Sequence, residues 1–201
     1  MNKTRGEYYV QHLRPDPAQM EGFMRVWNAA LAAAERGDQA EEQRLLKEEL
    51  RQFQILVSEE QFPNLVTNVG KNDLLDKYLL GAAYTQTIRM GLKGVGAAAA
   101  GDTQASHAGW LEQGLANAPT YTGNRKSVAM GAAAGQVSTS PVQAFAITSG
   151  GTVAGCFISN GGSATKDDTT GILFSAGDFT TGNKIVVNLD TLNVTYTLTA
   201  S

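Results

Sequence analysis

The clearest alternation of apolar and polar positions lies near the C-terminal end of the chain, within residues 171–199. Every second residue from Leu192 to Leu198 is apolar or aromatic, and threonine or asparagine residues lie between them. This period of two predicts a half-buried β-strand. Two shorter apolar runs at 172–174 and 185–187 precede it, each followed by turn-forming residues. The stretch therefore predicts three strands joined by turns, as in an antiparallel sheet.

Two stretches near the N-terminus place apolar residues three and four positions apart, which is typical of amphipathic helices. The first stretch follows Asp16-Pro17, an N-cap followed by a proline in the first turn. Gly37 fits a helix stop, and Asp38 fits the N-cap of a second helix. The pattern predicts a helical hairpin that ends at Phe62-Pro63, preceded by an extended arm over residues 1–14.

The rest of the chain predicts short elements separated by turns. A short helix is predicted at 73–80 and a strand at 84–92. Two further strands are predicted at 142–148 and 152–159, joined by a hairpin turn at Ser149-Gly150-Gly151. Six or so strands at this spacing favour a β-sandwich or a jelly-roll-like barrel.

A change in composition near Phe62 predicts two units. Only three of the 22 glycines, Gly6, Gly22 and Gly37, precede this point. The predicted fold class is therefore α+β and mainly β. An N-terminal arm and helical hairpin would cover residues 1–62, and an antiparallel β-sandwich or jelly-roll-like domain would cover residues 63–201.

Composition and charge narrow the classes of function. The net charge of -3 offers no basic surface for nucleic acid, and the 42% of hydrophobic residues suffices for a folded core. The N-terminus lacks a signal-peptide pattern and no apolar stretch reaches membrane-spanning length, so we expect synthesis in the host cytoplasm and no membrane partner. The single cysteine, Cys156, excludes an internal disulfide, and its apolar surroundings predict a buried thiol.

Groups that could carry chemistry are few. Asp102, Ser106 and His107 are neighbours on one predicted loop, whereas a catalytic triad needs groups held by separate rigid elements. Asp167-Asp168 could bind calcium, but Lys166 adjoins the pair and the EF-hand spacing is missing. We therefore predict no enzymatic activity, no cofactor and no metal site.

The apolar faces of the predicted hairpin are the strongest indication of a partner. A two-helix hairpin buries little surface alone, so these faces need a third surface. That surface could be the chain's own β unit, another copy of the chain or a separate protein. The residues predicted to bind a partner are Tyr8, Tyr9 and Leu13 in the arm, and Phe23, Trp27 and Phe53 in the helices.

Four stretches within 65–110 and 155–199 resemble a family of small structural proteins of tailed bacteriophages. They are NDLLDKY at 72–78, SHAGW at 106–110, GILFSAGDF at 171–179 and DTLNVTY at 190–196. Members of this family are head decoration (cement), head-fibre or minor capsid proteins, and the family implies no catalytic residues. The segment 1–62 is additional to the short members of the family, which suggests that it serves docking or oligomerisation.

The resemblance implies a capsid decoration protein on the outer head surface of the virion. It would bind the major capsid protein as a homotrimer and stabilise the assembled shell. The alternative is a head- or tail-fibre component that recognises a host surface glycan through the loops 94–101 or 160–170, with Tyr121 or Trp110 stacking on the sugar. A hydrolase with paired carboxylates is a third hypothesis, which the single glutamate beyond Glu60 does not favour.

Overall fold

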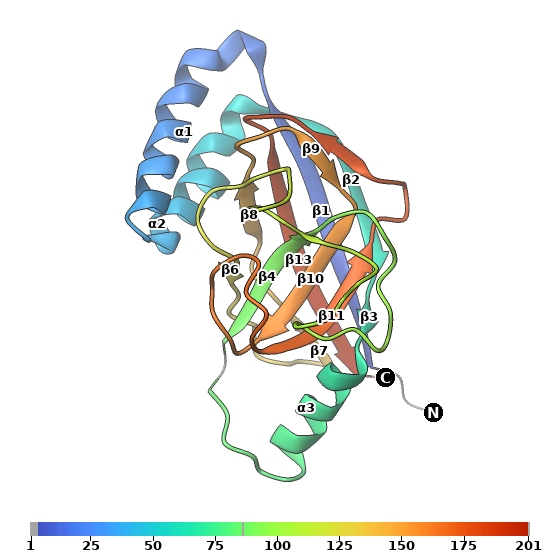
Figure 1. The fold of residues 1–201 in the computed structure, drawn as a ribbon. Helices are drawn as coiled ribbons and strands as arrows, with labels where there is room; N and C mark the ends of the chain where they lie inside the picture. Colours follow the sequence, from blue (N-terminus) through green and yellow to red (C-terminus); the bar gives the residue numbers. More distant parts are fainter. Residues whose placement is uncertain (1–3, 86, 201) are drawn as a thin grey trace.

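The structure, a computed structural model, describes residues 4–85 and 87–200, and most of its strands form two antiparallel sheets (Figure 1). The first sheet, sheet A, has the strand order β2-β1-β13-β7, and β8 also pairs with β13. Its strands are β1 (Thr4–Pro15), β2 (Gln54–Pro63), β7 (Val137–Thr139), β8 (Gln143–Ala146) and β13 (Thr191–Ala200).

The second sheet, sheet B, has the order β3-β11-β10-β4-β5, and β6 also pairs with β4. Its strands are β3 (Leu65–Val66), β4 (Ile88–Lys93), β5 (Glu112–Gln113), β6 (Lys126–Ser127), β10 (Gly155–Asn160) and β11 (Ile172–Asp178). A separate two-stranded sheet joins β9 (Gly151–Val153) to β12 (Lys184–Val186). With 38% strand and 23% helix, the chain confirms the predicted mainly-β class with an N-terminal helical part.

The main hydrophobic core lies between sheets A and B. Alternate residues of β1 and β13, including Tyr8 and Tyr196, face this core, and Met90, Cys156 and Ile158 contribute from sheet B. The tyrosine rings of β1 and β13 pack against each other with centroids 5.0 Å apart. The alternation that predicted a half-buried strand at 192–198 is thus the inward face of β13.

Helices cover the part of the outer face of sheet A that β8 forms (Figure 1). A 3-10 turn (Pro17–Gln19) leads into α1 (Met20–Glu35); α2 (Gln39–Arg44) continues through a π turn (Leu45–Glu49) and a 3-10 turn (Leu50–Phe53). The carboxylates of Asp16 and Asp38 accept backbone N–H bonds from Ala18 and Glu41, which confirms both N-caps. Gly37 has a φ of 74°, as the predicted helix stop requires.

The apolar stripe of these helices packs on the chain's own sheet. Its buried members form one cluster with Ala144 and Ala146, whose side chains lie on the outer face of β8. Gln43 adds two hydrogen bonds to the backbone of Ala144, at 2.7 and 2.8 Å. Of the three surfaces considered for the hairpin, the structure therefore provides the first, the chain's own β unit.

Two N-terminal predictions are wrong. Residues 4–15 form β1, which lies between β2 and β13, and not an extended arm. The second helix of the hairpin ends at Phe53, because residues 54–63 form the edge strand β2 beside β1. Both β1 and β2 thus belong to the same sheet as β13, although they fall within the predicted unit 1–62.

The pairing predicted from neighbouring strands is also wrong. The strands on either side of Ser149-Gly150-Gly151 do not form a hairpin, since β8 lies in sheet A, β10 in sheet B and β9 pairs with β12. The three strands predicted at 172–199 likewise fall into three different sheets. The apolar runs therefore predict the right kind of element but not its partner: β8 pairs with β13 and β9 pairs with β12, whereas β10 pairs with the next strand, β11.

Candidate interaction surface

The helix α3 (Asn68–Tyr78) is attached to sheet B by its first turn. Its N-cap, Thr67, accepts a hydrogen bond from the Gly70 N–H at 3.0 Å and donates from Oγ1 to the Leu173 carbonyl of β11. Gly70 is the buried residue of α3, and a Cβ at this position would collide with the carbonyl oxygen of Phe174. A glycine is therefore needed for the helix to approach β11 this closely.

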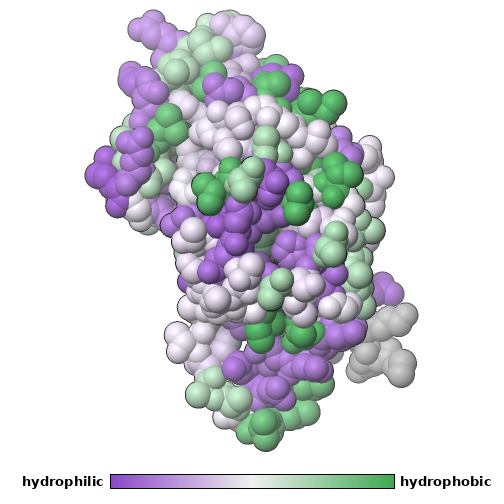
Figure 2. All heavy atoms as spheres, viewed as in Figure 1, coloured by the Kyte–Doolittle hydropathy of each residue, from purple (hydrophilic) through white to green (hydrophobic). Residues whose placement is uncertain are grey.

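The remainder of α3 and the segment after it project from one end of the molecule (Figure 1). Tyr78 is 85% exposed and Leu80 is 77% exposed, although both are large apolar side chains. We call the exposed apolar residues of this region the α3 surface: Leu74, Leu75, Tyr78, Leu79, Leu80 and Tyr84. Figure 2 shows hydrophobic residues at this end of the molecule, beside hydrophilic ones.

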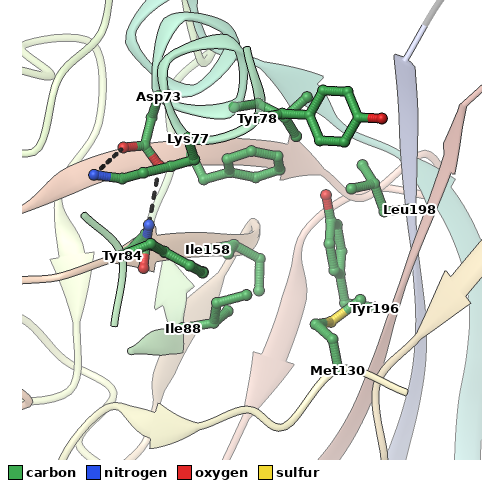
Figure 3. Close-up of a pocket in the computed structure, with 12 residues that line it drawn as sticks. Asp73, Lys77, Tyr78, Tyr84, Ile88, Met130, Ile158, Tyr196 and Leu198 are labelled. Atoms are coloured by element: carbon green, nitrogen blue, oxygen red, sulfur yellow. Dashed lines mark hydrogen bonds and ion pairs between the residues drawn. The ribbon is translucent and has the colours of Figure 1, made fainter. Parts of the chain in front are cut away.

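A cavity of about 310 Å³ opens beside the α3 surface. The walls of the cavity are almost wholly apolar. They come from α3, from the segment after it and from the ends of the neighbouring strands of both sheets. Figure 3 shows Tyr78 and Tyr196 facing the same space. Burial raises the pKa of Tyr196 to about 12, and its hydroxyl accepts a hydrogen bond from Asn64 at 3.1 Å. The phenol is therefore neutral at ordinary pH, and the cavity suits apolar groups.

Polar groups hold the rim of this cavity in place. The Asp73 carboxylate accepts a hydrogen bond from Asn160 at 2.9 Å and lies 3.8 Å from the Lys77 ammonium. Lys77 also donates to the Ala83 carbonyl at 3.1 Å and lies over the Tyr84 ring. These contacts connect α3 to β10 and to the segment after the helix. Because Leu74, Tyr78 and Tyr84 of the α3 surface also line the cavity, the two form one continuous apolar surface.

The six residues predicted to bind a partner lie elsewhere. Tyr8, Leu13 and Phe23 have no exposed surface and Trp27 is 2% exposed, because β1 and α1 pack into the cores of this chain. Phe53 is half-buried against the helical cluster. These side chains, which were predicted to bind a partner, therefore pack within the chain itself.

Of the six residues, Tyr9 is the one at the surface. Its side chain is 37% exposed on the outer face of sheet A, and its hydroxyl donates a hydrogen bond to Glu59 of β2.

The residues considered for catalysis or sugar stacking have structural partners. His107 Nδ1 bonds the Trp110 carbonyl at 2.9 Å, and Trp110 Nε1 donates to Asp102 at 2.9 Å. Asp102 and His107 therefore both bind Trp110 and do not form a catalytic triad with Ser106. Trp110 and Tyr121 are each 2% exposed, which corrects the prediction that they stack on a ligand.

Within residues 4–85 and 87–200, no group of three His, Cys, Asp or Glu side chains is placed to hold a metal ion. In the same part of the chain, no helix has the length and apolarity needed to cross a bilayer. Comparisons with family models, with curated proteins and with solved structures found no match.

Proposed function

We propose that this protein is a capsid decoration protein of a tailed bacteriophage, which binds the major capsid protein on the outer head surface through the α3 surface. The observation that carries the proposal is the exposure of large apolar side chains on α3 and on the segment that follows it. Monomeric proteins rarely leave such a patch in water unless it binds something. The resemblance of 72–78, which lies in α3, to phage structural proteins supports the choice of partner.

The size of the α3 surface suits a protein partner. If each large side chain offers about 150–250 Å² when fully exposed, the exposed fractions of its six residues correspond to on the order of 600–900 Å². A standard protein–protein interface buries about 800 Å² on each partner, so the α3 surface could form the apolar centre of one. Burying a leucine side chain contributes about 1.5–3 kcal/mol before the costs of association.

The proposed role is structural. A protein that binds only the assembled shell stabilises that shell by mass action, without any chemical step. In this proposal the two packed sheets correspond to a jelly-roll-like domain, three copies associate on the shell, and the protein resides on the outside of the virion. The net charge of -3 is consistent with a partner other than nucleic acid.

The test is binding of the purified protein to capsids that lack it. We expect the variant Leu79→Glu/Leu80→Glu to lose binding, because it places two charges in the apolar α3 surface. The fold should not change, because both side chains are more than 70% exposed and do not belong to the core. Ile185→Glu is the matched control, since Ile185 is 74% exposed on β12, away from the α3 surface. Sedimentation with capsids and the thermal stability of the decorated shell are the measurements. Undiminished binding by the double variant would contradict the proposal.

A further inference from the structure

The floor of the cavity beside the α3 surface is the main hydrophobic core itself. Ile158 of β10 and Tyr196 of β13 belong to that core, and both line the cavity. Ile88, Phe174 and Leu198 pack against the core and are half-buried, so an entering molecule can reach them. The cavity, of about 310 Å³, therefore continues the space between sheets A and B and opens toward α3.

The cavity is formed before any ligand arrives. Hydrogen bonds hold the first turn of α3 against β11, and the bond of 2.9 Å from Asn160 to Asp73 ties the helix to β10. The bond of 3.1 Å from Lys77 to the Ala83 carbonyl fixes the segment that follows the helix. Preformed walls lower the cost of binding, because little has to be ordered when a ligand enters.

The walls offer water few hydrogen-bond partners. The Tyr196 hydroxyl already accepts a hydrogen bond from Asn64, and the Asp73 carboxylate is already bonded by Asn160. A buried water normally makes about three hydrogen bonds, so water in this apolar space is poorly held. An apolar group that displaces such water gains free energy.

The size and lining of the cavity suit a ring. Its walls include four aromatic side chains, Tyr78, Tyr84, Phe174 and Tyr196. An apolar cavity of about 150 Å³ can hold benzene, and the sites of larger ligands begin at roughly 300 Å³. Figure 3 shows Ile88, Ile158 and Tyr196 around the space that such a ring would fill.

We propose that this cavity binds a small uncharged molecule built around one or two aromatic rings. A charged ligand is disfavoured, because apolar walls do not replace its hydration. Asp73 and Lys77 at the rim lie 3.8 Å apart and neutralise each other, so neither offers a free counter-charge. The proposal concerns the interior of the cavity and does not depend on capsid binding.

The experiment uses the full chain with isotope-labelled isoleucine methyl groups, observed by NMR. Indole and toluene are the uncharged probes, and benzoate and benzylammonium are the charged probes of similar size. We expect the uncharged probes to shift the methyl signals of Ile88 and Ile158 until they saturate. The signals of Ile55 and Ile185, which are exposed on β2 and β12, should not move. The charged probes should bind at least tenfold more weakly.

Two variants fill the cavity. Ile88→Phe adds volume at a half-buried position, so indole binding, read from the Ile158 signal, should weaken at least tenfold. Leu198→Phe is the second filling variant, on β13. Ile185→Phe is the matched control, because Ile185 is 74% exposed and does not line the cavity. An unchanged midpoint of thermal unfolding shows that a variant is folded.

Leu79 and Leu80 do not line the cavity, so Leu79→Glu/Leu80→Glu should bind indole as the wild type does. The two proposals can therefore fail separately. The ligand site is overturned if no uncharged probe shifts the Ile88 and Ile158 signals, if charged probes bind equally well, or if both filling variants bind indole like the wild type. Signals of Ile88 and Ile158 that respond to protein concentration and not to the probes would assign the cavity to a second copy of the chain, which also overturns the proposal.

Discussion

The ion pair between Glu42 and Lys126 ties the helices to sheet B, and its removal should be among the most destabilising polar changes in this chain. Both residues are 1% exposed, and Glu42 Oε1 lies 2.7 Å from the Lys126 ammonium. Lys126 also donates to the Thr122 carbonyl at 2.9 Å, and the Thr122 hydroxyl donates to Glu42. In Glu42→Gln, the ammonium stays buried without its counter-charge.

The expected loss follows from this burial. Breaking one side of a buried ion pair costs about 3–5 kcal/mol, whereas replacing both sides by groups of similar volume is often close to neutral. We therefore expect Glu42→Gln and Lys126→Met each to lower the free energy of unfolding by about 3 kcal/mol or more. The double variant should lose much less than the sum of the two.

The assay is urea unfolding of the four proteins in a double-mutant cycle at pH 7. Arg44→Gln is the control, because its ion pairs with Glu41 and Glu49 are exposed and should contribute little to stability. A cost below about 1 kcal/mol for Glu42→Gln, or losses that simply add in the double variant, would refute the reasoning.

The pH dependence of Glu42→Gln gives a second measure of the same pair. In the native protein, burial lowers the pKa of Lys126 while Glu42 opposes that shift. Without Glu42 the folded-state pKa should fall further below the unfolded value of about 10.4. The unfolded chain then binds more protons between those two values, so the stability of the variant should rise with pH across that interval.

Three other changes can be tested in the same way. Burial alone would raise the pKa of Asp190, but hydrogen bonds, of which that from Arg14 is the strongest, lower it to about 2. The folded protein should therefore lose about 2 kcal/mol of unfolding free energy as the pH falls from about 4 to about 2. Asp190→Asn should remove this part of the loss, measured by urea unfolding at each pH. Gly70→Ala should cost about 1–3 kcal/mol in urea unfolding because its Cβ meets the Phe174 carbonyl, although alanine normally favours a helix; a gain would show that α3 does not approach β11 so closely. Cys156 is buried, and burial raises the pKa of its thiol, so the native protein offers a reagent no accessible thiolate. A thiol reagent should therefore label Cys156 only when the protein unfolds. Immediate labelling of the native protein would contradict the placement of Cys156 in the core.

Local signals in the sequence predicted local structure well. Asp16, Gly37 and Asp38 mark helix ends by short-range hydrogen bonds and backbone conformation, so a few residues contain the information. The alternation in β13 likewise needs only the strand itself. These predictions are confirmed because neither depends on a distant partner.

Predictions failed where a distant residue decides the outcome. The first strand also alternates, but the polar residues His12 and Arg14 interrupt its apolar pattern. Both side chains bind Asp190, which lies 178 positions from His12 and 176 positions from Arg14. Leu56 and Val57 fit the helical spacing of the preceding stretch, whereas pairing with β1 makes this segment an edge strand.

The sequence does not reveal the α3 surface, for related reasons. In α3, apolar residues lie on several sides of a short helix, and no one-sided pattern marks them as exposed. Contacts between loops are hidden in the same way: Gln104 and Asp168 are 64 positions apart, and only the folded chain brings them together.

The pairing of β1 with β13 has a consequence for synthesis on the ribosome. The first strand emerges early and can pair with β2, but its other neighbour is not translated until roughly 130 residues later, which takes on the order of 6–25 s at about 5–20 residues per second. During that delay the nascent two-stranded ribbon exposes the edge of β1 that β13 later pairs, and the apolar side chains of Tyr8 and Val10. Premature termination before residue 191 should therefore release polypeptides that aggregate or recruit chaperones, rather than shortened native molecules.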